Sequence, residues 1–172
     1  MIILAFELFV IFYAVGLYLF MRQKQYKNVT RKFIILFFGV LFFEIISEPM
    51  WLNPGFDKWA YIYGDVTWIF TLGWLSVYMT SMILIDYFYG RLSAAKRFFM
   101  YILVAEAFII PMETFLIQSG VRGYASVLLN NLSGILIPYT QMPLEALLAF
   151  PMFTALIITF YKYMNRVMAE KC

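Results

Sequence analysis

Residues 2–21 read IILAFELFVIFYAVGLYLFM, and the only charged side chain among them is Glu7. At 1.5 Å per residue, about 20 apolar residues make a helix that matches the roughly 30 Å hydrocarbon core of a bilayer. The stretch is too long for the apolar region of a signal peptide, and no small-residue cleavage site follows it. We therefore expect residues 2–21 to form a transmembrane helix that the protein retains.

Four further stretches have the same apolar character, at about residues 33–51, 63–89, 98–117 and 143–164. Of the 172 residues, 64% are hydrophobic and 13% are charged, whereas a soluble domain carries about 25% charged residues. A water-soluble fold could not cover its surface with so few polar groups. The sequence predicts an all-α, polytopic membrane helix bundle of about five transmembrane helices, with residues 1–172 forming a single domain.

One apolar stretch is too short to cross a membrane. Residues 127–138 read VLLNNLSGILIP, and Asn130, Asn131 and Gly134 interrupt them. Segments of about 10–14 apolar residues are typical of interfacial or re-entrant positions rather than of full spans. We expect an interfacial or re-entrant segment near 127–138.

Basic residues are concentrated in three segments that fall on one side of a five-helix bundle. Residues 22–32, residues 91–97 and the tail from Lys162 hold five, three and three of the 13 Lys and Arg residues, which leaves Lys58 and Arg122 for the other side. Loops rich in Lys and Arg stay in the cytoplasm. The pattern predicts a protein of the cell membrane, with the N-terminus outside and the C-terminus cytoplasmic.

The composition excludes several kinds of chemistry. The chain has no histidine and a single cysteine, Cys172. The lack of histidine removes His-based catalysis and most zinc sites, and one cysteine forms no internal disulfide. The chain has no basic run of the kind that binds nucleic acid. We expect no metal, no cofactor and no nucleic-acid partner, and a membrane lipid or isoprenoid as the ligand.

Seven of the ten acidic residues fall inside an apolar span or at its outer end. A charged side chain inside a bilayer costs about 3 kcal/mol on insertion scales, so such residues face the interior of the bundle and mark functional sites. With only two bases on that side, we expect several of the acids to be protonated at neutral pH. The seven are Glu7, Glu44, Glu48, Asp65, Glu106, Glu113 and Glu145.

Four of these acids reach a similar depth from four different helices, and we predict that they are catalytic: Glu48, Asp65, Glu113 and Glu145. Glu44 shares a helix face with Glu48 by i, i+4 spacing, and Glu106 shares one with Glu113 by i, i+7 spacing. We predict that Glu44 and Glu106 bind substrate. Trp68 and Trp74 join them, because indole rings stabilise carbocations by cation–π contact.

A structural explanation exists for several of the acids and stays open here. Glu145 follows Pro143, so it can be the first-turn acid of a helix. Asp65 follows Gly64 and can be a helix cap. Glu48 precedes Pro49 and can end a helix, and Lys58 or Arg122 can neutralise a neighbouring acid. For the set as a whole, the cost of burying so many acids favours a functional polar cavity.

A P-x-E pattern occurs twice, as Pro111-Met112-Glu113 and Pro143-Leu144-Glu145. We expect Pro111 to kink or locally open its helix. Residues 143–154 resemble the P-x-E segment of the small membrane-embedded lycopene cyclases. That family carries a second acid and a Phe pair, where this chain has Ala146 and the single Phe150. The resemblance implies acid-initiated cyclisation of an isoprenoid end group, with Glu145 as proton donor.

Three functions remain open at this point. The first is a small intramembrane enzyme, a cyclase or isomerase that uses a carboxylic acid for proton transfer to an isoprenoid or other lipid. The second is a proton- or cation-coupled transporter or channel. The third is a non-catalytic membrane subunit whose acids pair with bases of another chain in a homo- or hetero-oligomer.

Overall fold

The computed structural model describes residues 2–170, and 73% of it is helical. Cys172, expected to be a lone cysteine, lies outside the described residues. Five helices are long and apolar enough to cross a membrane, which confirms the prediction of an all-α bundle with five spans. They are α1 (Ile2–Gln23), α2 (Val29–Ser47), α3 (Trp68–Tyr89), α4 (Ala94–Gln118) and α6 (Leu144–Glu170).

The helix boundaries differ from the predicted spans mainly at α2 and α3. Helix α2 starts at Val29 rather than at 33, directly after Asn28 in the left-handed conformation (φ 55°). It ends at Ser47 rather than at 51, because Pro49 lies in the next turn, a 3₁₀ turn η1 (Glu48–Met50). Helix α3 starts at Trp68 rather than at 63, where the Thr67 hydroxyl accepts a hydrogen bond of 3.3 Å from the Phe70 N–H.

Pro111 lies on the exposed side of α4, and the helix runs through it without a break from Ala94 to Gln118. At its other end α4 begins after Ser93, whose side chain accepts a hydrogen bond from the Lys96 N–H. The local opening of the helix expected at Pro111 is therefore absent, since the helix continues through this residue.

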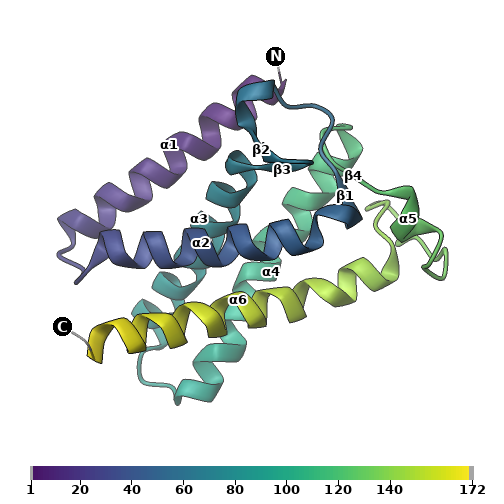
Figure 1. Ribbon diagram of the computed structural model, residues 1–172. Coiled ribbons are helices and arrows are strands. Elements are labelled where there is room, and N and C mark those ends of the chain that lie inside the picture. The colour runs from purple at the N-terminus through teal and green to yellow at the C-terminus, as the bar shows by residue number, and fades with distance from the viewer. Residues whose placement is uncertain (1, 171–172) are drawn as a thin grey trace.

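Helix α3 is the centre of the bundle (Figure 1). It is the most buried of the five long helices and packs against α1, α2 and α4. Helix α6 packs against α2 and α4 and so closes a ring made of α2, α3, α4 and α6. Helix α1 packs on the outside of this ring, against α3 and α2, and leaves large apolar side chains such as Phe9 and Phe12 exposed. Such a surface suits contact with lipid chains.

Two short antiparallel pairs of strands form one end of the bundle, which we call the hairpin end. Strand β1 (Trp51–Leu52) pairs with β4 (Gly123–Tyr124). After the 3₁₀ turn η2 (Lys58–Ala60), strand β2 (Tyr61–Tyr63) pairs with β3 (Val66–Thr67) across a turn in which Gly64 has φ +50°. The turn at Gly64 folds residues 61–67 back on themselves, so residues 63–67 form a hairpin rather than an extension of α3.

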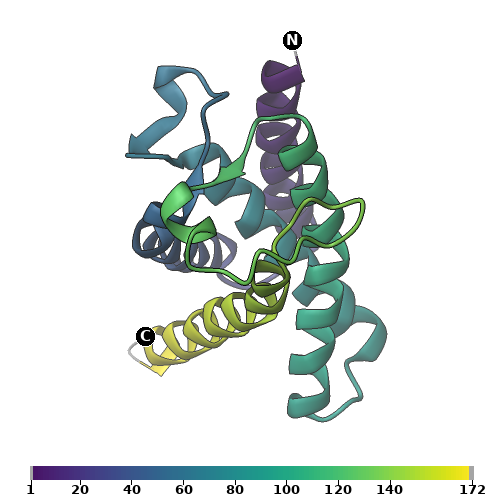
Figure 2. The same cartoon turned by 90° about the vertical axis from the view of Figure 1, so that its right-hand side faces the viewer.

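The segment between α4 and α6 also lies at the hairpin end, where it crosses the start of α6 (Figure 2). Only α5 (Ser126–Leu129) is helical in it. Residues 127–138 do not cross the bundle, in agreement with the prediction from the sequence. They do not form a helix along their whole length, because only α5 is helical. Asn130 ends α5 after one turn, and the left-handed Gly134 (φ +78°) prevents the helix from resuming.

The opposite end, which we call the basic end, contains the α1–α2 turn, the α3–α4 turn and the end of α6 (Figure 1). An Arg31 guanidinium N–H donates to the Met168 carbonyl at 3.2 Å, which joins the start of α2 to the end of α6. Asp86 accepts hydrogen bonds from Arg97 at 2.9 Å and from the Tyr101 hydroxyl at 2.6 Å. The three basic segments of the sequence thus meet at one end.

Candidate functional site

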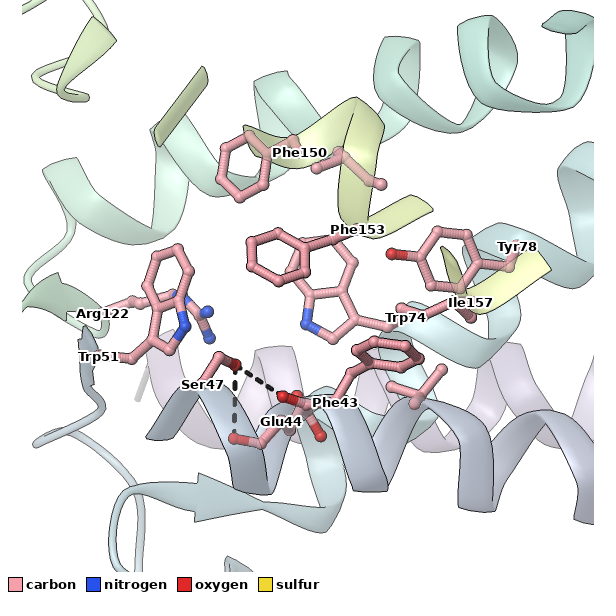
Figure 3. A pocket seen from close by; sticks show the side chains of 12 residues that line it. Phe43, Glu44, Ser47, Trp51, Trp74, Tyr78, Arg122, Phe150, Phe153 and Ile157 are labelled. Carbon is pink, nitrogen blue, oxygen red and sulfur yellow. Dashed lines mark hydrogen bonds between the residues drawn. The ribbon is translucent and has the colours of Figure 1, made fainter. Parts of the chain in front are cut away.

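A cavity of about 60 Å³ lies inside the ring of α2, α3, α4 and α6, near the hairpin end, and is partly open to the outside of the bundle. We call it the central cavity (Figure 3). Aromatic side chains make up much of its wall, and Glu44, Ser47 and Arg122 supply the polar groups. The remaining residues that line it are Val40, Phe43, Trp51, Trp74, Tyr78, Ile109, Phe150, Phe153 and Ile157.

Glu44 is the one acid among the described residues that line the central cavity. It projects from α2, and its carboxyl group accepts a hydrogen bond from the hydroxyl of the fully buried Thr71 on α3. One turn later on α2, Ser47 donates to the Phe43 carbonyl at 2.8 Å, so its hydroxyl is bound to its own helix (Figure 3). Glu44 is therefore held in place by α3 while facing a mainly aromatic space.

Arg122 enters the cavity wall from the loop after α4. The chain turns back there, and the N–H groups of Val121 and Arg122 both donate to the Leu116 carbonyl, at 3.1 Å and 3.2 Å. The Arg122 guanidinium carbon lies 4.1 Å from the ring centroid of Trp51 and 4.7 Å from that of Phe70. Both distances are in the range of cation–π attraction.

Arg122 and Glu113 form a buried ion pair, with 2.7 Å between Arg122 Nε and Glu113 Oε1. Both side chains are almost fully buried, at 6% and 0% exposure. The N–H group does not point at the oxygen well enough for a hydrogen bond, so the contact is an ion pair by distance alone. Glu113 thus neutralises the charge that Arg122 brings into the wall.

Tyr124 lies beside this pair in strand β4. Its ring packs on that of Trp51, with centroids 5.1 Å apart. Burial raises the pKa of the Tyr124 hydroxyl, and the Glu113 carboxylate raises it further. Tyr124 therefore stays neutral at physiological pH.

Glu48 and Asp65 bind the loops of the hairpin end to each other. The Asn53 N–H donates to Asp65 Oδ1 at 3.0 Å, and the Asp65 N–H donates to Glu48 Oε1 at 3.2 Å. The Asn53 side chain in turn lies 3.5 Å from Arg122. A small space of about 20 Å³ separates these groups from Glu44. Glu48 and Asp65, two of the four acids predicted to be catalytic, thus hold the loops together beside the central cavity.

Glu106 lies just outside the central cavity. Its Oε1 accepts a hydrogen bond of 2.6 Å from the Thr154 hydroxyl, and its buried Oε2 has no hydrogen-bond partner among the described residues. One turn further along α4 and α6, Ile109 and Ile157 line the cavity. The Tyr78 hydroxyl points toward the cavity from α3 (Figure 3).

Glu145 lines a second cavity of about 160 Å³, which we call the side cavity. Glu145 lies in the first turn of α6 and its Oε1 accepts a hydrogen bond of 2.8 Å from the Ser133 N–H. Its place in the first turn fits the structural explanation given above. The other residues of this lining are Met50, Trp51, Leu128, Leu132, Ala146, Ala149, Phe150 and Phe153.

Of the two tryptophans predicted to bind substrate, Trp74 lines the central cavity and Trp68 does not. The Trp68 indole N–H donates to the Trp59 carbonyl at 3.1 Å, and the two indole rings are 5.0 Å apart. Glu7 lies on α1, outside the ring, where it is 1% exposed and neither carboxyl oxygen has a hydrogen-bond partner among the described residues.

Apart from Trp74, the aromatic residues of the cavity wall were not predicted to bind substrate. Trp51, Tyr78, Phe150 and Phe153 resemble the many other aromatic residues of the chain. One feature of the sequence could have indicated Arg122 as part of the site: it is one of only two bases expected on the outer side. A lone base among many acids is a natural partner for one of them.

No protein-family model matches this chain, and neither a curated protein nor a solved structure is similar to it. Within residues 2–170, no three His, Cys, Asp or Glu side chains gather in a way that would hold a metal ion.

Proposed function

We propose that this protein is an intramembrane enzyme that transfers a proton from Glu44 to a carbon–carbon double bond of an isoprenoid or other unsaturated lipid. The observation that carries the proposal is a single carboxyl group, fixed by Thr71, that faces a cavity walled by aromatic rings. A carboxyl group in such an apolar site is kept neutral and can act as an acid.

The proposed reaction needs no redox partner. The Glu44 proton adds to one alkene carbon, and the new C–H bond leaves a carbocation on the neighbouring carbon. A second double bond of the same chain can attack this cation, which closes a ring and moves the positive charge to the other carbon of that double bond. With or without ring closure, the remaining cation then loses a proton from an adjacent carbon. That proton returns to the Glu44 carboxylate, so the product is an isomer of the substrate.

The cavity wall suits a cationic intermediate. The rings of Trp74 and Trp51 line the space in front of Glu44, and an aromatic face attracts a cation by about 2 kcal/mol or more where water is excluded. Arg122 does not oppose the cation with a full charge, because Glu113 pairs with it at 2.7 Å. In this proposal Glu113, Asp65 and Glu48 position the wall, and Glu44 takes the catalytic role.

Neutralising Glu44 tests the proposal against the role that the cyclase resemblance implies for Glu145. We expect Glu44→Gln to lower formation of an isomerised lipid at least about 100-fold, the lower bound for losing a general acid. Glu145→Gln retains an oxygen that accepts from Ser133 and should leave most of the activity. The measurement is mass spectrometry of isoprenoid lipids from cells that express each variant at equal level.

Proton- or cation-coupled transport is the competing function, since Glu44, Glu106 and Glu113 are all buried or half-buried around the same cavity. Between Glu106 and the basic end lie fully buried apolar side chains such as Leu36 and Ile158. The hydroxyls of the buried Ser81 and Tyr101 also lie in this region, and they donate to the Val77 carbonyl and to Asp86. Purified protein in liposomes should therefore leave a proton gradient intact. Flux that Glu44→Gln abolishes, together with an unchanged lipid profile, would replace the enzyme by a transporter.

A further inference from the structure

The side cavity and the central cavity share one wall. Trp51, Phe150 and Phe153 line both of them. The rings of Trp51 and Phe150 are nearly parallel, with centroids 6.2 Å apart and 12° between their planes. One layer of aromatic side chains is therefore all that separates the two spaces.

The side cavity is suited to hydrocarbon. Apart from Glu145, every residue that lines it is apolar. Oε1 of Glu145 is bound to the Ser133 N–H, and the buried Oε2, which has no hydrogen-bond partner among the described residues, is the one free polar atom of the acid. Cavities with such walls stay dry and take up apolar molecules, because water finds too few partners in them.

The outer wall of the side cavity is a thin segment with apolar side chains on both faces, and its outer face also carries the exposed polar residues Ser126, Asn130 and Asn131. Leu128 and Leu132 face the cavity, while Val127 and Leu129 are exposed on the other face, at 68% and 43%. Two contacts hold the segment to the bundle: the Ala125 N–H donates to the Met50 carbonyl at 3.0 Å, and Ser133 is bound to Glu145. The segment therefore presents apolar side chains both to the side cavity and to its outer surface.

We propose that the side cavity binds the hydrocarbon tail of the substrate while the reacting double bond occupies the central cavity. The ligand is a single linear, unsaturated chain of the isoprenoid type. Such a chain is long enough to reach past Phe150 and Phe153, whose rotation on binding would be an ordinary side-chain adjustment. This inference rests on the proposed function, because it concerns the same substrate.

A photoreactive lipid tests the inference without requiring turnover. The full-length protein in nanodiscs is irradiated with a diterpenoid alcohol that carries a diazirine at the end remote from its hydroxyl, and mass spectrometry locates the adducts. We expect adducts at Met50, Leu128 and Ala149, which disappear when an excess of the alcohol without diazirine is present.

A matched pair of α6 variants makes the test specific. Ala149→Trp fills the side cavity without touching the central one, so the tail loses its space there and labelling should fall about tenfold. Its neighbour Leu148 is 63% exposed on the lipid-facing side, so Leu148→Trp should leave labelling unchanged. If Ala149→Trp does not fold, the competition experiment on the unmodified chain still decides.

The outcomes separate this inference from the proposed function. Adducts confined to the exposed face of α1, such as Phe9 and Phe12, would overturn the tail site even if Glu44 proves essential for product formation. Competable labelling of the side cavity that persists in Glu44→Gln supports the tail site. If no isomerised lipid is found, this labelling still supports the tail site, and only the proposed proton transfer by Glu44 is contradicted.

Discussion

At the scale of single residues, the most consequential contact is the ion pair of Arg122 with Glu113. Two charges taken out of water cost several kcal/mol each, and the pair recovers this only while both members are present. Arg122 also lies over Trp51 and Phe70, so the pair fixes the aromatic wall as well as the loop after α4. The pair therefore supports the geometry of the central cavity from behind.

Removing Arg122 should destabilise the protein strongly, although Arg122 lies in a loop rather than in a helix. We expect Arg122→Met to lower the free energy of unfolding by about 3–5 kcal/mol, because Glu113 is left buried without a counter-charge. Denaturation in detergent followed by circular dichroism measures the loss.

Two further variants control that prediction. Lys58 is exposed at the same end of the bundle, so Lys58→Met should change stability little. The double variant Arg122→Met with Glu113→Gln should recover most of the loss, since no unpaired charge remains. Equal instability of the single and double variants would show that the pairing of charges is not what matters.

At the scale of the elements, the contact between α2 and α6 sets the distance between these two helices on the side of the central cavity that faces the basic end. A Cβ atom on Gly39 of α2 would lie 2.8 Å from Cδ1 and 3.0 Å from Cε1 of Phe160 on α6. The two helices can approach this closely only because residue 39 has no side chain. Small residues at helix contacts serve this purpose in membrane proteins.

A larger residue at position 39 should push α6 away from α2. We expect Gly39→Val to cost about 1–3 kcal/mol of stability through overpacking, and Phe160→Ala in the same chain to relieve part of it. Gly16 on α1 has no atom within 4 Å of the place where a Cβ would lie, so Gly16→Val is the matched control. Equal losses for the two glycine variants would contradict the close approach.

The elements also show how far the sequence could be interpreted. The five long helices are predictable because the length of an apolar stretch is a local property. The site depends on contacts that are distant in sequence, such as the pairing of Trp51 with Tyr124, and on where α2 ends. Glu44 and Glu48 line one small space of about 20 Å³, in agreement with their i, i+4 spacing. Only Glu44 also lines the central cavity, and Glu48 accepts a hydrogen bond from the Asp65 N–H.

At the scale of the whole molecule, charge separates the two ends of the bundle. The three basic segments meet at the basic end. The hairpin end contains the acids Glu48 and Asp65, and Trp51 of this end lines both cavities. The positive-inside rule then predicts that the basic end lies in the cytoplasm and the central cavity toward the outer leaflet. This orientation is a prediction from charge.

Cysteine labelling checks the orientation. In a chain with Cys172→Ser, we expect a membrane-impermeant maleimide to label Lys58→Cys in intact cells and to label Lys96→Cys only after permeabilisation. Both positions are exposed, at the hairpin end and the basic end respectively. Labelling of Lys96→Cys from outside would reverse the orientation and move the site to the inner leaflet.

The most direct test of Glu44 as a proton donor is deuterium incorporation from D₂O. A carboxyl group that exchanges with solvent and then protonates carbon leaves deuterium in a C–H position that water alone does not exchange. With unmodified protein in nanodiscs of isoprenoid-containing lipid, we predict a gain of one deuterium per product molecule, lost in Glu44→Gln and retained in Glu145→Gln. Product without deuterium, or deuterium incorporation by Glu44→Gln at the unmodified rate, would contradict the account.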